Sequence, residues 1–335
     1  FTSWGPTDDG RVKPDVMAVG TSLFSTTNTS DKSYATQSGT SMSSPQAAGS
    51  LYLIQQLYNR LNKNTFMLAS TLKAIAIHTA MDMEAAGPDY KTGYGLIQLD
   101  RAAALVKNEG NHHLLKEEKL TQAETKTYTF TSSGNGPLKA TIAWTDPEAT
   151  TSAALNDRTP RLVNDLDIRL TSGSSTFLPF TLNPATPDAL AIPGDNIRDN
   201  VEQIVINNTM PGQTFTLTVS HKGVLKNSSQ DYGVAVSGIG GPAYCALATT
   251  TTTSNFQKLT LGTTKDSTGL SPAFTAELGA SLPLVFQFAG SGTRNTSLYA
   301  DWNQDGDFTD AGEELYSSST GATSIHIPST LKQDN

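Results

Sequence analysis

The residues most suited to chemistry lie in the stretch SGTSMSSP at positions 38–45. A serine hydroxyl can attack a carbonyl carbon when it is exposed, when a base takes its proton and when N–H donors hold the oxyanion. The first amides of a helix have no internal acceptor and carry partial positive charge. If a helix begins here, Ser41 offers both its Oγ and its own N–H to a carbonyl group. The stretch therefore predicts a nucleophile at the start of a helix.

The residues around Ser41 are those that a helix start needs. Thr40 suits the N-cap, Gly39 allows close approach of another backbone, and Pro45 is tolerated because a missing N–H costs least in the first turn. Apolar residues at helical spacing then run from Gln46 to Leu61 and predict a buried core helix, with small residues at 47–49 for close packing on a sheet. Capping alone explains most Ser-rich and Thr-rich stretches of this kind, so more evidence is needed.

The whole run GTSMSSPQAAG resembles the nucleophile motif of the subtilisin-like serine proteases, G-T-S-x-[AS]-x-P-x-x-A-G. Two other blocks resemble the same family: FTSWGP with GRVKPDVMAVG before the motif, and GYGL with the helical LDRAAALV after it. Together they cover residues 1 to about 108. The resemblance implies the C-terminal third of a subtilase catalytic domain, with Ser41 as nucleophile and oxyanion N–H donor and Thr40 as oxyanion support.

The resemblance also implies an aspartate, a histidine and an oxyanion-hole asparagine before the nucleophile, and none has its family context here. His78 lies in the apolar helical run LKAIAIHTA, which predicts a core histidine. Asp8, Asp9 and Asp15 lack the D-[ST]-G context, and Asp15 is expected to hold loop backbone. We therefore expect that the upstream part of the same polypeptide supplies the missing groups and that this part alone is inactive.

Three alternatives use the same residues differently. An α/β-hydrolase elbow needs the motif G-x-S-x-G. Position 43 is Ser where that motif needs its second Gly, so the motif is not met. The sedolisin family also has S-G-T-S before a helix, but Met42, the following Ser-Ser-Pro and the KPDV block favour the subtilisin type. The third alternative is a non-catalytic adhesin or substrate-binding protein in which the protease-like part is a relic.

Short β-branched or alternating segments at 125–238 predict an antiparallel β-sandwich. Residues 112–241 resemble the jelly-roll-like domain that follows the catalytic domain in one branch of bacterial subtilases, on the pieces LVNDLDI and DNVE. Asp165 and Asp167 would face the same side of a strand, where two like charges need a cation, hydrogen-bond donors or water. Solvated or backbone-bonded carboxylates are expected here rather than a calcium site.

The stronger metal signal is DWNQDGDF, where oxygen-bearing side chains alternate around a glycine. We predict a structural calcium site at Asp301, Asn303, Asp305 and Asp307, with an Asx-rich turn as the alternative. Gly312 stands where an EF-hand needs glutamate, so the loop is not an EF-hand. Residues 242–335 resemble part of the GEVED domain, a β-sandwich appended to secreted bacterial proteins.

The composition fits a globular protein of several domains. The 335 residues are 37% apolar and 16% charged, and the net charge of -8 comes without long charged runs, so nothing indicates a nucleic acid or anionic membrane as partner. The single cysteine, Cys245, allows no internal disulfide and no thiolate zinc cluster. No apolar run approaches the roughly 18 residues of a membrane span.

We therefore predict a multidomain protein of α/β and all-β parts. Residues 1–108 are expected to be the C-terminal part of a subtilisin-like α/β domain, 112–241 a jelly-roll-like β-sandwich and 242–335 a partial second β-sandwich. The predicted function is the nucleophile-bearing part of a secreted or cell-surface serine endopeptidase that acts on protein or peptide substrates.

Overall fold

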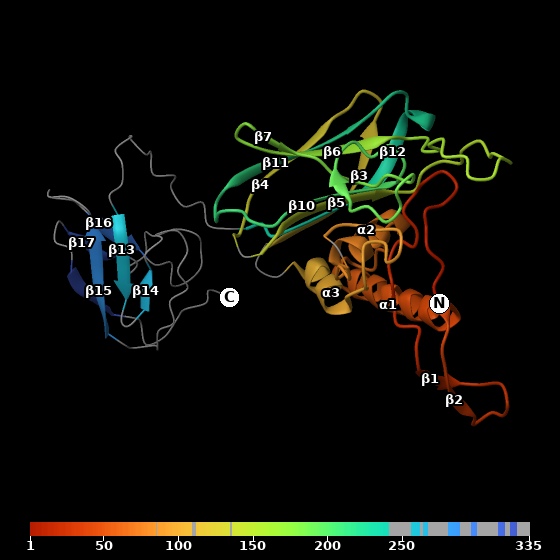
Figure 1. The fold of residues 1–335 in the computed structure, drawn as a ribbon, viewed down its shortest axis with the longest axis horizontal. Helices are drawn as coiled ribbons and strands as arrows, with labels where there is room; N and C mark the ends of the chain where they lie inside the picture. The colour runs from red at the N-terminus through yellow and green to blue at the C-terminus, as the bar shows by residue number, and fades with distance from the viewer. Residues whose placement is uncertain are drawn as a thin grey trace. The chain divides into compact units, whose positions relative to one another are not determined.

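The computed structural model describes residues 1–84, 86–108, 112–134 and 136–240, and beyond these the strands at 256–261, 264–266, 281–288, 296–299, 314–318 and 322–326. The chain divides into two compact units, Phe1–Gly241 and Pro242–Asn335. The first unit contains the helices and two large sheets (Figure 1). No helix of the described residues has the length and apolar character of a membrane span.

Three α-helices lie among the described residues of the first unit: α1 at Thr40–Leu61, α2 at Ala69–Thr79 and α3 at Leu99–Lys107. The sequence predicted each of them. The N-cap of α1 is Gly39, however, and Thr40 is the first helical residue, so the prediction of Thr40 as N-cap is wrong. Gly39 has φ 156° and ψ 164°, a backbone conformation that favours glycine, and no described side chain caps the helix.

Helix α1 is buried along one side only. Ile54 is its one fully buried residue among those described, in a cluster with residues of α2 and α3. Tyr52 and Leu53 are 71% and 53% exposed, and a Cβ on Gly49 would meet no atom within 4 Å. The expectation of a core helix packed on a sheet is therefore wrong for the described residues, because apolar side chains occur on two sides of α1 and only one side is covered.

The described residues of the first unit also form two four-stranded antiparallel sheets, with strand orders β10-β5-β12-β3 and β4-β11-β6-β7. Their strands are β3 His113–Thr121, β4 Lys126–Thr131, β5 Leu138–Trp144, β6 Leu166–Ser172, β7 Ser175–Phe177, β10 Val201–Ile206, β11 Thr214–His221 and β12 Ser229–Ser237. One apolar core joins the two sheets, with Ile142 and Trp144 of β5 packed among residues such as Leu170 and Leu217. The predicted antiparallel strands are thus present, and alternate residues of each face the shared core.

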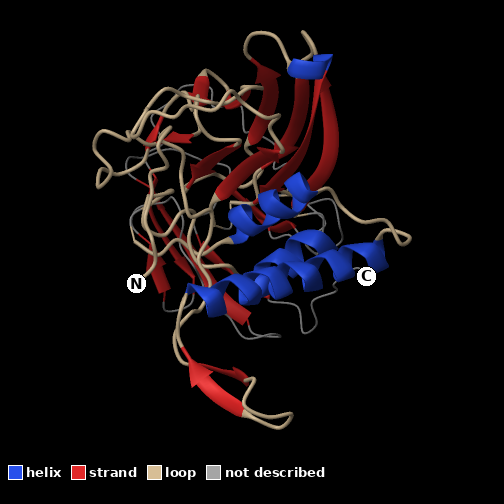
Figure 2. Cartoon of the chain, turned by 90° about the vertical axis from the view of Figure 1, so that its right-hand side faces the viewer, coloured by secondary structure: helices blue, strands red, loops and turns tan. Residues whose placement is uncertain are grey.

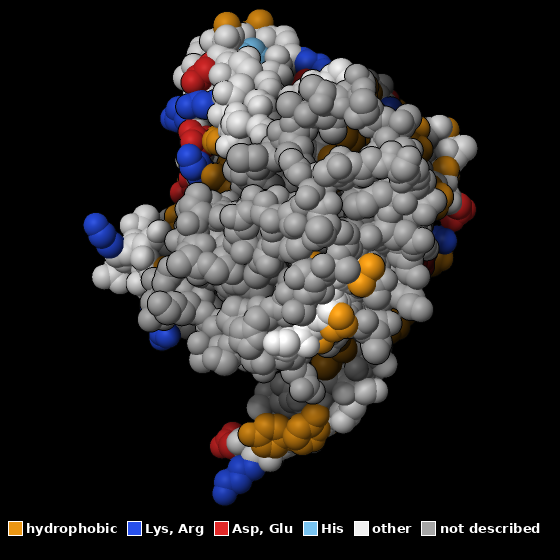
Figure 3. Space-filling model, turned by 90° about the vertical axis from the view of Figure 1, so that its left-hand side faces the viewer, with side chains coloured by type: hydrophobic (Ala, Val, Ile, Leu, Met, Phe, Trp, Pro, Cys, Tyr) orange, Lys and Arg blue, Asp and Glu red, His pale blue; other side chains and the backbone are white. Residues whose placement is uncertain are grey.

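The remaining strands of the first unit are short pairs. A hairpin of β1 Leu23–Thr26 and β2 Tyr34–Gln37 precedes α1, and β8 Phe180–Thr181 pairs with β9 Ile192–Pro193. Phe24 and Tyr34 of the hairpin stack with ring centroids 5.6 Å apart, and both are exposed. Figure 3 shows hydrophobic side chains gathered on this projecting hairpin. A 3-10 turn, η2 Lys226–Ser228, leads into β12.

The described strands of the second unit form a sheet of order β14-β13-β15-β18 and a pair β16-β17. They are β13 Phe256–Leu261, β14 Thr264–Asp266, β15 Ser281–Phe288, β16 Thr296–Tyr299, β17 Glu314–Ser318 and β18 Ala322–His326. The expected β-rich character of this region is confirmed. Cys245 and the predicted calcium ligands Asp301, Asn303, Asp305 and Asp307 lie outside the described residues.

The helices lie on the outer face of one sheet of the first unit (Figure 2), where α2 contacts β5 and β12. The closest approach is at Gly233 of β12, where a Cβ would lie 2.5 Å from Cα of Thr71. Ala74 and Ile77 of α2 share an apolar cluster with Ala143 of β5. Because backbone meets backbone here, the helical segment and the β-sandwich form one compact unit.

Candidate active site

Ser41 is the second residue of α1, and its side chain is exposed. The amides of Thr40 and Ser41 belong to the first turn, which has no acceptor within the helix. No acidic residue lies in this turn, so the positive end of a 22-residue helix is not neutralised locally. The predicted placement of Ser41 at a helix start is confirmed, and the residue is exposed.

The motif is joined to the segment that precedes the β1–β2 hairpin. Three hydrogen bonds connect them: Gly39 N–H to Gly20 C=O at 2.7 Å, Ser22 N–H to Ser38 Oγ at 2.9 Å, and Ser43 Oγ–H to Ala18 C=O at 2.8 Å. Two of the hydroxyl residues in the motif therefore hold the backbone together. Ser41 Oγ has no such bond among the described residues.

The loop before this segment is fixed by ion pairs and by a glycine turn. The carboxylate of Asp15 lies 2.8 Å from Lys13 Nζ and 3.1 Å from Lys73 Nζ. Burial raises the pKa of Asp15, but Lys73 and Lys13 outweigh it and hold that pKa below its ordinary value. The expectation that this carboxylate binds loop backbone is therefore wrong; its carbonyl oxygen accepts from Tyr94 N–H instead. Gly93 has φ 64°, and a Cβ there would lie 2.1 Å from the carbonyl oxygen of Pro14.

Comparison with known proteins points to one family. The model of the subtilase family matches residues 1–95. These residues belong to the subtilase family. The match contains the Ser41 motif, the loop of Asp15 and the Gly93 turn, so residues 1–95 are called the subtilase segment below.

Relatives of the subtilase segment are named as proteases. A serine protease/ABC transporter B family protein, tagA of Dictyostelium discoideum, is 25% identical over 201 residues, which is 51% of this chain and 11% of that protein. The PII-type proteinase of Lactococcus lactis subsp. cremoris is 40% identical over 77 residues, 23% of this chain and 4% of that protein. The C5a peptidase of Streptococcus pyogenes is 47% identical over 58 residues, 17% of this chain and 5% of that protein. The chain thus spans about a tenth or less of these relatives.

Among solved structures, a periplasmic inhibitor of g-type lysozyme from Aeromonas hydrophila matches with a TM-score of 0.20 and 15% identity, over 38% of this chain and 85% of that chain. A score this low carries no argument about the fold.

His78 of α2 is a structural residue and not a partner of Ser41. It is 3% exposed, its Nδ1 lies 2.9 Å from Thr141 Oγ1 and its Nε2 lies 2.9 Å from Ser237 Oγ. Burial lowers the pKa of His78 well below its ordinary value, and the charge of Lys139 adds to this. The prediction of a core histidine is confirmed. Among the described residues, no histidine or carboxylate forms a hydrogen bond with Ser41.

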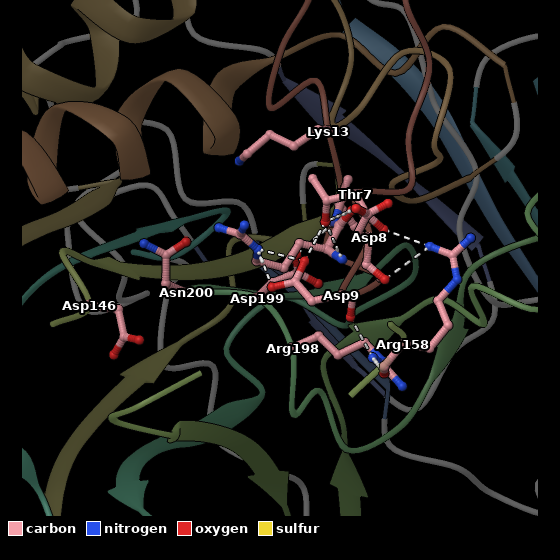
Figure 4. Close-up of polar contacts among 12 residues, drawn as sticks. Thr7, Asp8, Asp9, Lys13, Asp146, Arg158, Arg198, Asp199 and Asn200 are labelled. Carbon is pink, nitrogen blue, oxygen red and sulfur yellow. Dashed lines mark hydrogen bonds and ion pairs between the residues drawn. The ribbon is translucent and has the colours of Figure 1, made fainter. Parts of the chain in front are cut away.

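The β-sandwich holds the first loop of the subtilase segment through polar contacts that sequence reasoning missed (Figure 4). The bonds are Val12 N–H to Asp199 Oδ1 at 2.8 Å, Arg198 Nη1 to Asp9 C=O at 2.6 Å, and Arg158 Nη1 to Thr7 C=O at 2.6 Å. Burial raises the pKa of Asp199, and the bond from Val12 offsets this only in part. The DNVE piece supported the family resemblance, but nothing local to it indicated a bond 187 residues away.

The carboxylates of the LVNDLDI piece are paired with basic side chains. Lys222 Nζ lies 3.3 Å from Asp165 Oδ2 and 3.1 Å from Asp167 Oδ1, and Arg169 lies 3.2 Å from the latter. Burial raises the pKa of both aspartates. The expectation of solvated or backbone-bonded carboxylates is wrong, because a lysine from β11's end supplies the cation. No group of three or more His, Cys, Asp or Glu among the described residues could hold a metal ion.

The buried neutral His78 makes stability depend on pH. In the unfolded chain its pKa is about 6.5, so protons bind the unfolded state first as the pH falls. The contribution of His78 to the free energy of unfolding is therefore constant above about pH 6.5. Below that pH, we expect protonation of His78 in the unfolded chain to lower the free energy of unfolding by about 1.4 kcal/mol per pH unit. Urea unfolding of the wild-type chain and of His78→Gln between pH 7.5 and 5.5 measures this, with a shallower slope expected for the variant. An equal pH dependence of the free energy of unfolding in wild type and variant would contradict a buried, neutral His78.

Proposed function

We propose that this chain carries the nucleophile of a subtilisin-type serine endopeptidase. Ser41 Oγ would attack the carbonyl carbon of a peptide bond, and the Ser41 N–H would hold the oxyanion that forms. Collapse of this tetrahedral intermediate would break the peptide C–N bond and release the amine, which would take the proton that the base removed from Ser41. Water would then hydrolyse the acyl-enzyme and restore the Ser41 hydroxyl. The observation that carries the proposal is an exposed serine at the N-terminus of α1 inside the subtilase segment.

Attack requires a base, and the described residues bring none to Ser41. We propose that the upstream part of the same polypeptide supplies a histidine to take the proton, an aspartate to orient it and an asparagine as a further oxyanion donor. Two observations support this: His78 has both ring nitrogens bound, and the relatives named as proteases are far longer than this chain. We expect the chain by itself to be inactive.

The substrate and the surroundings are proposed on the same basis. Proteins or peptides would be cleaved outside the cell or at its surface, since the chain resembles secreted proteases and the relatives are a proteinase and a peptidase by name. We further propose that residues 1–108 complete a catalytic domain, that 112–241 form a jelly-roll-like sandwich and that 242–335 form part of a GEVED-type domain.

A fluorophosphonate probe tests the nucleophile directly, because it reacts only with an activated serine. We expect the full-length protein to be labelled and Ser41→Ala to lose all labelling. Ser44→Ala is the matched control, since Ser44 is exposed in the same turn and has no side-chain hydrogen bond among the described residues. Absence of labelling in a folded wild-type protein would favour the adhesin or substrate-binding alternative.

Thr40 is proposed to support the oxyanion next to Ser41. We expect Thr40→Val in the full-length protein to lower kcat by about tenfold with little change in KM, because the oxyanion exists only in the transition state. Steady-state kinetics on a peptide substrate measure this, and Thr40→Ser, which keeps the hydroxyl, is the control. A turnover number unchanged by Thr40→Val would remove Thr40 from the site.

Calcium is proposed as a structural ligand of Asp301, Asn303, Asp305 and Asp307. We expect isothermal titration of the whole chain with millimolar CaCl₂ to give binding heat, and Asp305→Ala with Asp307→Ala to abolish it. Absence of heat with the unmodified chain would leave the Asx-rich turn as the better interpretation.

A further inference from the structure

Ser43 follows the nucleophile by two residues, and its side chain is directed to another segment. It is half-buried, and its Oγ donates a hydrogen bond of 2.8 Å to the carbonyl of Ala18, 25 residues earlier. The family motif accepts either Ala or Ser at this position, so the hydroxyl is a feature of this chain beyond the motif. A hydroxyl that is not needed for the motif but is bound across the fold requires its own explanation.

A second bond holds the same segment to the start of α1. Gly39 N–H donates to Gly20 C=O at 2.7 Å. A Cβ on Gly20 would lie 2.9 Å from the Gly39 oxygen and 3.2 Å from Ser43 Cβ, so the two backbones are in close contact. Because Gly39 and Ser43 stand on either side of Ser41, the two bonds fix both the position and the direction of the turn that presents the nucleophile.

The segment that accepts these bonds is itself anchored in the first unit. Met17 N–H donates to Gly95 C=O at 2.8 Å, and Ile97 N–H donates to Met17 C=O at 3.0 Å. Gly95 in turn packs so closely on Met81 that a Cβ would lie 2.1 Å from its carbonyl oxygen. Ser43 therefore connects the nucleophile's turn to a fixed part of the structure.

We propose that Ser43 is a positioning residue for Ser41, which it serves by holding the first turn of α1 on the carbonyl of Ala18. This inference rests on the proposed function. A nucleophile displaced by about 1 Å loses much of its rate. Ser43 itself is expected to touch neither the reacting atoms nor the substrate, so its loss should lower kcat and leave KM nearly unchanged.

The matched pair Ser43→Thr and Ser43→Val tests this in the full-length protein, because the two side chains have similar shape and differ in the hydroxyl. We expect Ser43→Val to lower kcat about tenfold with KM within twofold, and Ser43→Thr to stay within about threefold of wild type. Ser43→Ala, which deletes the hydroxyl without adding bulk, should resemble Ser43→Val. Ser50→Ala, which removes a hydroxyl from the same helix without a side-chain bond among the described residues, should leave kcat unchanged.

Kinetics are measured well below the Tm of each variant and normalised to the concentration of fluorophosphonate-reactive sites, so that unfolded protein does not count. A wild-type kcat in Ser43→Ala, an equal loss in the Thr and Val variants, or a rise in KM alone would overturn the positioning role. Persistent labelling of Ser41→Ala would overturn the proposed function instead, whatever Ser43 does, and an unlabelled wild-type protein would overturn both.

Discussion

The close contact of α2 with β5 and β12 is the constraint on which the first unit depends. At Gly233 the strand admits no side chain, because a Cβ would lie 2.5 Å from the backbone of Thr71. Apolar residues of α2 fill the space around this contact, and His78 binds hydroxyls of both strands. An apolar interface alone would tolerate sliding, whereas a buried imidazole with two fixed partners allows one position of the helix on the sheet.

Polar contacts connect α2 to the loop that holds the first turn of α1. Lys73 lies on α2 and pairs with Asp15, and it also donates to Asn200 of the β-sandwich. Asp199, which directly precedes Asn200, accepts a hydrogen bond from Val12 N–H. The loop of residues 12–20 is thus fixed by the sandwich on one side and by the glycine turn on the other, and its end holds the first turn of α1. The β-sandwich is therefore part of what positions the subtilase segment.

Local patterns predicted the elements of this structure well and their partners poorly. The helices, the alternating strands and Ser41 at a helix start follow from spacing and from turn residues over a few positions. The N-cap was assigned wrongly because Gly39 uses a backbone conformation that side-chain preferences do not reveal. The roles of Asp199 and Lys222 depend on residues far away in sequence, which no local pattern contains. The exposed side of α1 was missed because apolar spacing shows that a side can be buried but not what covers it.

Under the proposed function, the described residues would supply the part of the chemistry that needs no proton transfer. The helix amides around Ser41 carry fixed partial charges, which would stabilise an oxyanion at any pH at which the helix is folded. A base must instead change its protonation state near neutral pH, and burial holds His78 neutral far below that range with both nitrogens bound. Under the proposed function, the pH dependence of catalysis belongs to the groups that complete the site, and the fixed geometry belongs to this chain.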